Sequence, residues 1–233
     1  MKIRNVFWQM SELSKVLLKQ IPLTSIIRSK SYSQFWEDRL MSRLISDHVG
    51  SYVDIGAGTP VWGSNTYFFY RRKWCGVTID PIKFNVLLHK IMRPRDFQYQ
   101  SLVSKNIFEV DFYELQPWEL STTEEKLARQ RIRAGARLIS KWSSKTISLR
   151  EIYLKNPIIR PGILSIDVEG AEMDVLESND WKSNTPDLIC IEELQNPITH
   201  SAIRKYLYER NYNLVAYNGV SSIYVLNGSA FIK

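Results

Sequence analysis

Two glycines and two acidic residues stand at a spacing that suits the binding of a nucleoside. Gly56 and Gly58 follow the apolar stretch Tyr52–Ile55, and Asp80 ends a second apolar stretch, 24 residues after Gly56. Glycine lets the backbone take positive φ and approach a ligand closely. An acid at this distance can accept hydrogen bonds from both hydroxyls of a ribose. Asp54 could orient the turn or meet a cationic ligand group. This pattern predicts a cofactor with an adenosyl group.

The turn does not match the pattern of dinucleotide-binding proteins. The motif G-x-G-x-x-G requires glycine at position 61, which is Val61 here. Binding of a pyrophosphate at this turn is therefore poorly supported. S-adenosylmethionine (SAM) has no phosphate and carries a sulfonium and an amino group, so a carboxylate near the turn suits it better. We therefore expect SAM, and a purely structural turn is the alternative.

Four further residues are candidates for contacts with this cofactor. Asn65 and Thr66 begin the helix predicted after the turn, where they could meet a carboxylate or merely cap the helix. Gln34 lies in a segment before the first strand that could cover the cofactor. Asp96 could contact the adenine edge, or form an ion pair with a neighbouring arginine.

Three acidic residues at predicted strand ends could take up a proton. Asp167 and Glu169 lie in the stretch IDVEG, and Glu192 ends the next strand. Carboxylates that lie close together tend to raise one pKa, which makes a usable general base. A carboxylate that caps the next helix or holds the turn at Gly170 is the structural alternative. Asp167 and Glu192 could also hold Mg²⁺ through oxygen ligands, but a metal is not favoured.

Short apolar strands alternate with helices, and this alternation predicts how the candidate residues are positioned. It favours parallel strands covered by helices on both faces, with ligands at their carboxyl ends. Asn218 and Gly219 predict a closing hairpin. We expect an α/β, Rossmann-like fold: a doubly wound, mostly parallel seven-stranded sheet with a C-terminal antiparallel hairpin. The predicted strands are Tyr52–Ile55, Gly76–Ile79, Tyr99–Val103, Ile163–Val168, Leu188–Ile191, Tyr212–Tyr217 and Ser222–Leu226.

Residues 1–30 differ from the rest of the chain in charge and apolar pattern. They hold six Lys and Arg residues against Glu12, in a chain of net charge +7, and apolar residues recur at helical spacing before Pro22. We interpret them as a basic amphipathic helix that packs on the domain, attaches to an anionic membrane surface or binds a partner protein. Residues 31–233 are expected to form one domain, with 104–150 as an insertion.

A second basic segment and the histidines carry weaker signals. Lys126–Ser140 is basic and helix-prone; it could meet a phosphate-bearing carrier, although a solvated helix face is favoured. The histidines are scattered, show no metal-ligand spacing, and are expected to be structural or on the surface. They are His48, His89 and His200.

Cysteine content and hydropathy bear on the compartment. Cys75 and Cys190 lie in apolar runs typical of buried strands, and the chain shows no disulfide framework. No apolar run approaches the roughly 18 residues needed to span a bilayer, and the N-terminus is not a convincing signal peptide. We expect a cytoplasmic protein, with peripheral contact at the inner face of the membrane as an option.

Four stretches together resemble the FkbM family of SAM-dependent methyltransferases. They are SYSQFWED (31–38), YVDIGAGTPVWGSNTYFFYRRKWCGVTIDP (52–81), RPRD (93–96) and LSIDVEGAEMDVLE (164–177). The resemblance implies a class I methyltransferase fold and O-methylation, often of sugars. By analogy, it implies that the acceptor is a sugar hydroxyl of a bacterial surface polysaccharide or related glycan, or of a lipid-linked glycan precursor.

Two other functions stay open on sequence alone. The basic charge is compatible with an RNA methyltransferase. Much of the excess positive charge lies in residues 1–30, however, and the sequence shows no known RNA-binding module, so nucleic acid is not favoured as a partner. The second is a non-catalytic subunit that keeps the fold and tethers a partner through residues 1–30. The intact acids Asp54 and Asp80 argue against it.

Overall fold

The computed structural model describes residues 31–46, 49–106, 108–156, 161–194 and 201–233. The helix expected in residues 1–30 lies outside this range. The strands are β1 (Ser51–Ile55), β2 (Cys75–Asp80), β3 (Phe97–Gln100), β4 (Leu102–Val103), β5 (Glu109–Gln116), β6 (Arg137–Ile147), β7 (Pro161–Ile166), β8 (Leu188–Glu192), β9 (Tyr212–Tyr217) and β10 (Ser221–Leu226). The helices are α3 (Glu37–Leu44), α4 (Tyr67–Arg71), α5 (Lys83–Met92), the 3-10 helix η1 (Trp118–Leu120), α6 (Glu125–Arg133), α7 (Leu149–Lys155), α8 (Glu172–Glu177) and α9 (Ala202–Tyr208).

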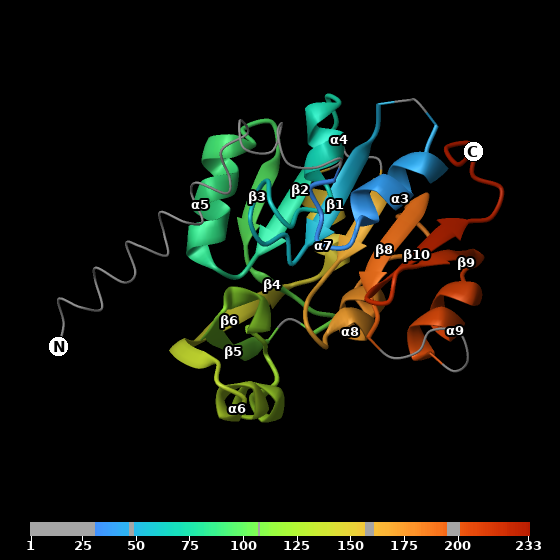
Figure 1. Ribbon diagram of the computed structural model, residues 1–233. Coiled ribbons are helices and arrows are strands. Elements are labelled where there is room, and N and C mark those ends of the chain that lie inside the picture. Colours follow the sequence, from blue (N-terminus) through green and yellow to red (C-terminus); the bar gives the residue numbers. More distant parts are fainter. Residues whose placement is uncertain (1–30, 47–48, 107, 157–160, 195–200) are drawn as a thin grey trace.

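Seven strands form one sheet in the order β3-β2-β1-β7-β8-β10-β9 (Figure 1). β10 pairs antiparallel with β8 and with β9, and the other neighbours run parallel. The central strands are rich in Val, Ile and Leu because both of their faces are covered. The predicted doubly wound, mostly parallel sheet with a closing hairpin is confirmed. Its strand order reverses between β1 and β7, the place where ligands bind in such sheets.

Two hydrophobic cores cover the two faces of this sheet. Val53 and Ile55 of β1 pack in one core with α7, α8 and α9, whereas Tyr52 packs in the other core with α3 and α4. Successive residues of a strand point to opposite faces, which explains this division. Asp54 therefore points to the same face as Tyr52, and this direction decides its partners in the site.

The residues between β3 and α7 form a second sheet, in the order β4-β6-β5. With α6 it makes a lobe at the lower left of Figure 1, beside the main sheet. The strand expected over Tyr99–Val103 is divided, because β3 pairs with β2 whereas β4 pairs with β6. The helical segment expected over Lys126–Ser140 ends at Arg133, and the chain turns back as β6 from Arg137.

The described residues also bear on the expectations from hydropathy and cysteine content. None of the helices found in them has the length and apolar character that crossing a bilayer would require. Cys75 begins β2 and Cys190 is buried in β8, and both are free thiols.

Candidate active site

A cavity of about 520 Å³ opens at the carboxyl ends of the parallel strands and extends to the second sheet. Phe108, Val110 and Phe112 line it from the second sheet and the chain that leads into it. Its volume lies in the range of small-molecule sites, about 300 to 1,000 Å³. The structure brings together eight of the predicted site residues in its wall: Gln34, Gly56, Gly58, Asn65, Asp80, Asp167, Glu169 and Glu192.

The glycine turn after β1 forms one side of the cavity. Gly56 has a φ of +73°, and a Cβ placed on it would lie 1.6 Å from the backbone oxygen of Asp167. No other residue fits there without a shift of the backbone. Gly58 has a φ of +57°, but a Cβ on it would meet nothing within 4 Å. The first glycine is therefore required by the packing of β1 against the chain after β7, and the second leaves open space over the turn.

Asp80 joins the end of β2 to this turn. Its carboxylate accepts hydrogen bonds from the backbone amides of Gly58 at 2.9 Å and Ile82 at 2.7 Å, and from the Asn85 side chain at 3.2 Å. Burial raises the pKa of Asp80 to about 7, against the opposing effect of these donors. The acid thus fixes the turn and also lies in the cavity wall.

His89 supports the turn from behind, a role that the sequence did not suggest. It lies one helical turn after Asn85 on α5, and its Nε2 donates to the backbone oxygen of Gly58 at 3.2 Å. Burial, and then the nearby Arg93 charge, hold the pKa of His89 well below its usual value, so the ring is neutral. The i, i+4 spacing of Asn85 and His89, which puts both on one face of the helix, is the sequence signal that could have found it.

Three predicted cofactor contacts, Asp54, Thr66 and Asp96, do not line the cavity. Asp54 accepts a hydrogen bond from Thr66 Oγ1 at 2.5 Å, beneath the start of α4. Asp96 accepts from the Tyr52 hydroxyl at 2.7 Å and from the Gly76 amide at 3.0 Å. All three are buried on the α4 side of the sheet, so their interactions in the structure are with the protein itself.

Arg93 connects these three residues, and sequence reasoning missed its importance. Its Nε forms an ion pair with Asp96 at 2.7 Å, and both side chains are completely buried. The same guanidinium donates to Thr66 Oγ1 at 2.9 Å and to Ser64 Oγ at 3.2 Å. The alternative interpretation of Asp96, an ion pair with a neighbouring arginine, is the one that the structure shows. The network fixes the end of the loop that begins with the glycine turn.

Asn65 and Gln34 lie in the cavity wall beyond the turn. Asn65 donates its side-chain amide to Ser165 Oγ on β7 at 3.3 Å. Gln34 lies beside Gly63, since a Cβ built on that glycine would come within 3.7 Å of the Gln34 amide nitrogen. Both side chains have positions from which a ligand over the turn can be reached, and their contacts with a cofactor stay predictions.

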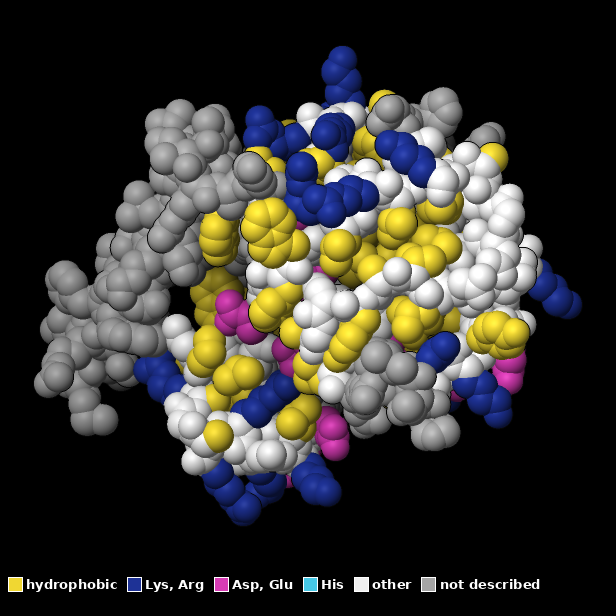
Figure 2. Space-filling model, turned by 45° about the vertical axis from the view of Figure 1, so that its right-hand side comes forward, with side chains coloured by type: hydrophobic (Ala, Val, Ile, Leu, Met, Phe, Trp, Pro, Cys, Tyr) yellow, Lys and Arg dark blue, Asp and Glu magenta, His cyan; other side chains and the backbone are white. Residues whose placement is uncertain are grey.

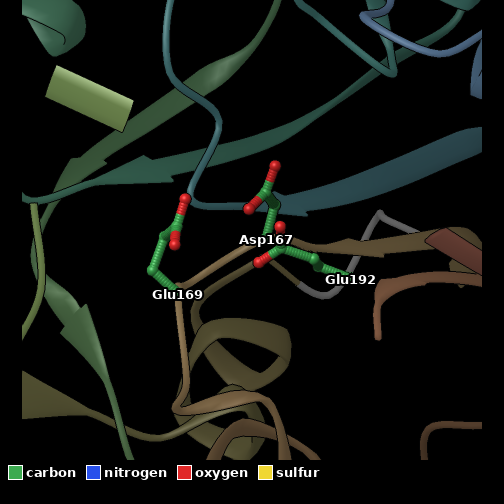
Figure 3. Close-up of side chains that lie close together, drawn as sticks. All are labelled: Asp167, Glu169 and Glu192. Atoms are coloured by element: carbon green, nitrogen blue, oxygen red, sulfur yellow. The ribbon is translucent and has the colours of Figure 1, made fainter. Parts of the chain in front are cut away.

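Three carboxylates lie together in the cavity wall, at the ends of β7 and β8. Oxygen atoms of Asp167, Glu169 and Glu192 lie within 4.8 Å of one another (Figure 3). They come together because β7 and β8 are parallel neighbours whose carboxyl ends meet at one edge of the sheet. Burial, and then the charges of Glu192 and Glu169, raise the pKa of Asp167 well above its usual value. Burial, and then the Glu169 charge, raise the pKa of Glu192 to about 7.

Glu169 differs from the other two carboxylates because a cation neutralises it. It forms an ion pair with Arg131 of α6, and its residue takes a φ of +57°. Arg131 also donates to the backbone oxygen of Leu120 at 2.9 Å. Burial raises the pKa of Glu169, and Arg131 opposes that shift. The second sheet and α6 are thereby tied to the loop after β7.

This arrangement allows two kinds of chemistry. Carboxylates with raised pKa values can accept and release a proton near neutral pH. Three carboxylate oxygens at this spacing could also coordinate one hard divalent cation, because Mg²⁺ and Ca²⁺ prefer oxygen ligands. Within the described residues, no other group of three or more His, Cys, Asp or Glu side chains has such a geometry.

Comparison with known proteins decides the family. The model of the FkbM methyltransferase domain matches residues 54–214, more than half of the chain. The chain belongs to the FkbM methyltransferase family. The match includes the glycine turn, Asp80 and the three carboxylates of the cavity. A comparison with curated proteins gives no match. The cavity is therefore the candidate active site of an FkbM methyltransferase.

Proposed function

We propose that this FkbM methyltransferase uses SAM to methylate a sugar hydroxyl of a bacterial surface polysaccharide or a related glycan, free or lipid-linked. The observation that supports the proposal is the composition of the single cavity described above. The glycine turn, Asp80, Asp167 and Glu192 all belong to its wall. The turn and Asp80 suit an adenosyl cofactor, and Asp167 and Glu192 suit removal of a proton from a hydroxyl.

The residues around the turn fit SAM. The open space over Gly58 leaves room for a ligand against the backbone. An ionised carboxylate has about four acceptor positions, and Asp80 receives three donors, so a ribose hydroxyl can still donate to it. Asn65 and Gln34 would contact the methionine part. When bound, the cofactor supplies a methyl group on a positively charged sulfur.

Asp167 and Glu192 would handle the proton of the acceptor. With SAM bound, the acceptor oxygen would take the methyl group from the sulfur, and Asp167 or Glu192 would accept the proton that the acceptor oxygen loses. The raised pKa makes each carboxylate a better proton acceptor than an ordinary one, and that of Glu192 is about 7. Glu169, paired with Arg131, would hold the second sheet over the acceptor rather than act as the base.

The acceptor would lie between the carboxylates and aromatic side chains. Trp62 and Trp118 line the cavity from opposite elements, the loop after the glycine turn and η1. Indole rings are suited to packing against the apolar face of a sugar ring. Contact of residues 1–30 with an anionic membrane, and location at its cytoplasmic face, are parts of the proposal that would bring the enzyme to a lipid-linked acceptor.

Calorimetric titration with S-adenosylhomocysteine (SAH) tests the cofactor, with NAD as the control ligand. We expect micromolar binding of SAH and none of NAD. Absence of SAH binding would favour the non-catalytic alternative.

Asp167→Asn should lower turnover roughly a hundredfold, as expected for loss of a general base, with little change in SAH affinity. Glu151→Gln, on α7 and outside the cavity wall, serves as the control. Unchanged turnover in Asp167→Asn would remove that residue as the base.

A further inference from the structure

Every charged residue that lines the cavity, among those that the structure describes, is acidic. Three are the carboxylates at the ends of β7 and β8. The other four are Glu37, Asp80, Glu119 and Asp174. No Lys, Arg or His belongs to the described wall, although the chain has a net charge of +7. The described wall of the cavity, where an acceptor would bind, is therefore acidic although the chain as a whole is basic.

The basic residues near the cavity have other partners. Arg131 is paired with Glu169 and with the oxygen of Leu120. Arg129 pairs with Glu125 at 2.6 Å on the exposed side of α6. In Figure 2, Lys and Arg side chains stand out at the top of the face and on the lobe at the bottom, with acidic side chains between. The expectation that the basic segment meets a phosphate group therefore has no support from the cavity.

Two of the carboxylates have no cation of their own. Within the described residues, neither Asp167 nor Glu192 forms an ion pair or accepts a hydrogen bond from a side chain. Glu37 differs, because it accepts from Asn218 at 2.9 Å and from Ser221 at 3.1 Å. The sulfonium of SAM would bring one positive charge to this cavity, and an acceptor that brings a second one to the ends of β7 and β8 would neutralise this pair. A ligand with a phosphate or carboxylate would meet repulsion there.

Aromatic side chains accompany these acids in the wall. Phe35, Trp62, Phe108, Phe112 and Trp118 all line the cavity. Walls that combine aromatic faces with carboxylates bind organic cations, since the ring faces and the acids both attract positive charge. A ring-shaped acceptor with an ammonium group satisfies both features.

We propose that the acceptor is an amino sugar whose protonated amine lies beside the hydroxyl that receives the methyl group. The inference rests on the proposed function and narrows its substrate class. The ammonium faces Asp167 and Glu192, and the ring packs against the aromatic side chains. The same charges disfavour a carboxylate or phosphate on the sugar that receives the methyl group.

The test compares methyl glycosides that differ in one substituent. The set comprises 2-amino-2-deoxy glycosides in the gluco, galacto and manno configurations, their 2-acetamido and 2-hydroxy counterparts, and the matching uronides. Their binding to SAH-loaded protein is measured by calorimetry, and methyl transfer from labelled SAM is measured in parallel. We expect at least one free amine to bind about tenfold more tightly than its neutral counterparts, since tenfold is about 1.4 kcal/mol, within the range of one charge contact near a protein surface. The uronides should bind most weakly.

Variants and ionic strength separate a charge effect from shape. Glu119→Gln, at the exposed end of the cavity, should reduce the preference for the amine. Glu125→Gln, an exposed acid of α6 outside the wall, should leave it unchanged. The preference should also weaken as salt is raised.

Three results would overturn the inference. One is SAH binding with no binding of any free amine, which would leave the cofactor assignment intact. The second is equal or tighter binding of the uronides. The third is activity that needs a divalent metal and shows no amine preference, since the carboxylates would then serve the metal. Failure of SAH itself to bind would overturn the proposed function as well, so the two failures are distinguishable.

Discussion

Replacement of Arg93 by methionine tests whether the buried network holds the loop that follows β1. Arg93 and Asp96 are both completely buried and lie 2.7 Å apart. Methionine fills much of the same space but has no charge and no donor. Asp96 would keep the Tyr52 hydroxyl and the Gly76 amide as partners and would lose its only cationic partner among the described residues.

The expected loss of stability follows from this geometry. Removal of one partner of a buried ion pair costs about 3–5 kcal/mol, because the remaining charge stays buried. That is a large part of the roughly 5–15 kcal/mol that stabilises a typical domain. At about 2–4 °C per kcal/mol for a chain of this size, the melting temperature should fall by roughly 6–20 °C. Ser64 and Thr66 also lose a donor, so SAH affinity should fall.

Urea unfolding followed by tryptophan fluorescence measures the change, with thermal melts in parallel. Lys90→Met, at an exposed position of the same helix, is the matched control and should cost little. The double variant Arg93→Met with Asp96→Asn removes the orphaned charge and should recover part of the loss. A loss below about 1 kcal/mol, the scale of an exposed pair, would refute the reasoning. So would a double variant less stable than Arg93→Met.

Three further predictions concern the cavity. Gly56→Ala should abolish SAH binding or prevent folding, since its Cβ would overlap the Asp167 backbone oxygen. Circular dichroism combined with SAH titration distinguishes a misfolded variant from a folded one that does not bind. Wild-type affinity for SAH would contradict the close contact between Gly56 and Asp167. Asp80→Asn should weaken SAH binding about tenfold, as for loss of one charged hydrogen bond, with Glu151→Gln, outside the cavity wall, as control. The pKa of Glu192 is about 7, against an ordinary value of 4.5. It predicts that activity and stability change in opposite directions as pH rises. Its base form accumulates above pH 7, so kcat/KM should rise through that value. Between about pH 4.5 and 7 the folded state holds a proton that the unfolded state has released, so the unfolding free energy should fall as pH rises. A flat kcat/KM profile from pH 6 to 8 would argue against Glu192 as the base.

Some of the site was predictable because parallel strands place their carboxyl ends at one edge of a sheet. Gly56, Asp80, Asp167 and Glu192 follow or end apolar runs, so the order of strands and helices was enough to bring them together. The closing hairpin was also predictable, since Asn218 and Gly219 lie between two apolar strands. These features depend on local pattern and on one general rule of α/β folds.

Other features depended on side-chain direction and on contacts between distant segments. Asp54 lies two residues from the turn, but strand alternation points it to the α4 side, where Thr66 donates to it. Asp96 is buried on the same side of the sheet, where it forms an ion pair with Arg93. No local pattern shows which face of a strand looks toward a ligand when both faces are buried.

The sequence by itself determined the family, the mostly parallel α/β fold with its closing hairpin, and the acids at the ends of the strands. Only the tertiary structure decided the charge and the shape of the cavity. The second sheet closes one side with aromatic side chains, α6 uses Arg131 to neutralise Glu169, and among the described residues no cation forms an ion pair with Asp167 or Glu192. The physical reason is that net charge is a sum over the whole chain, whereas an acceptor meets only the few side chains that folding brings around it.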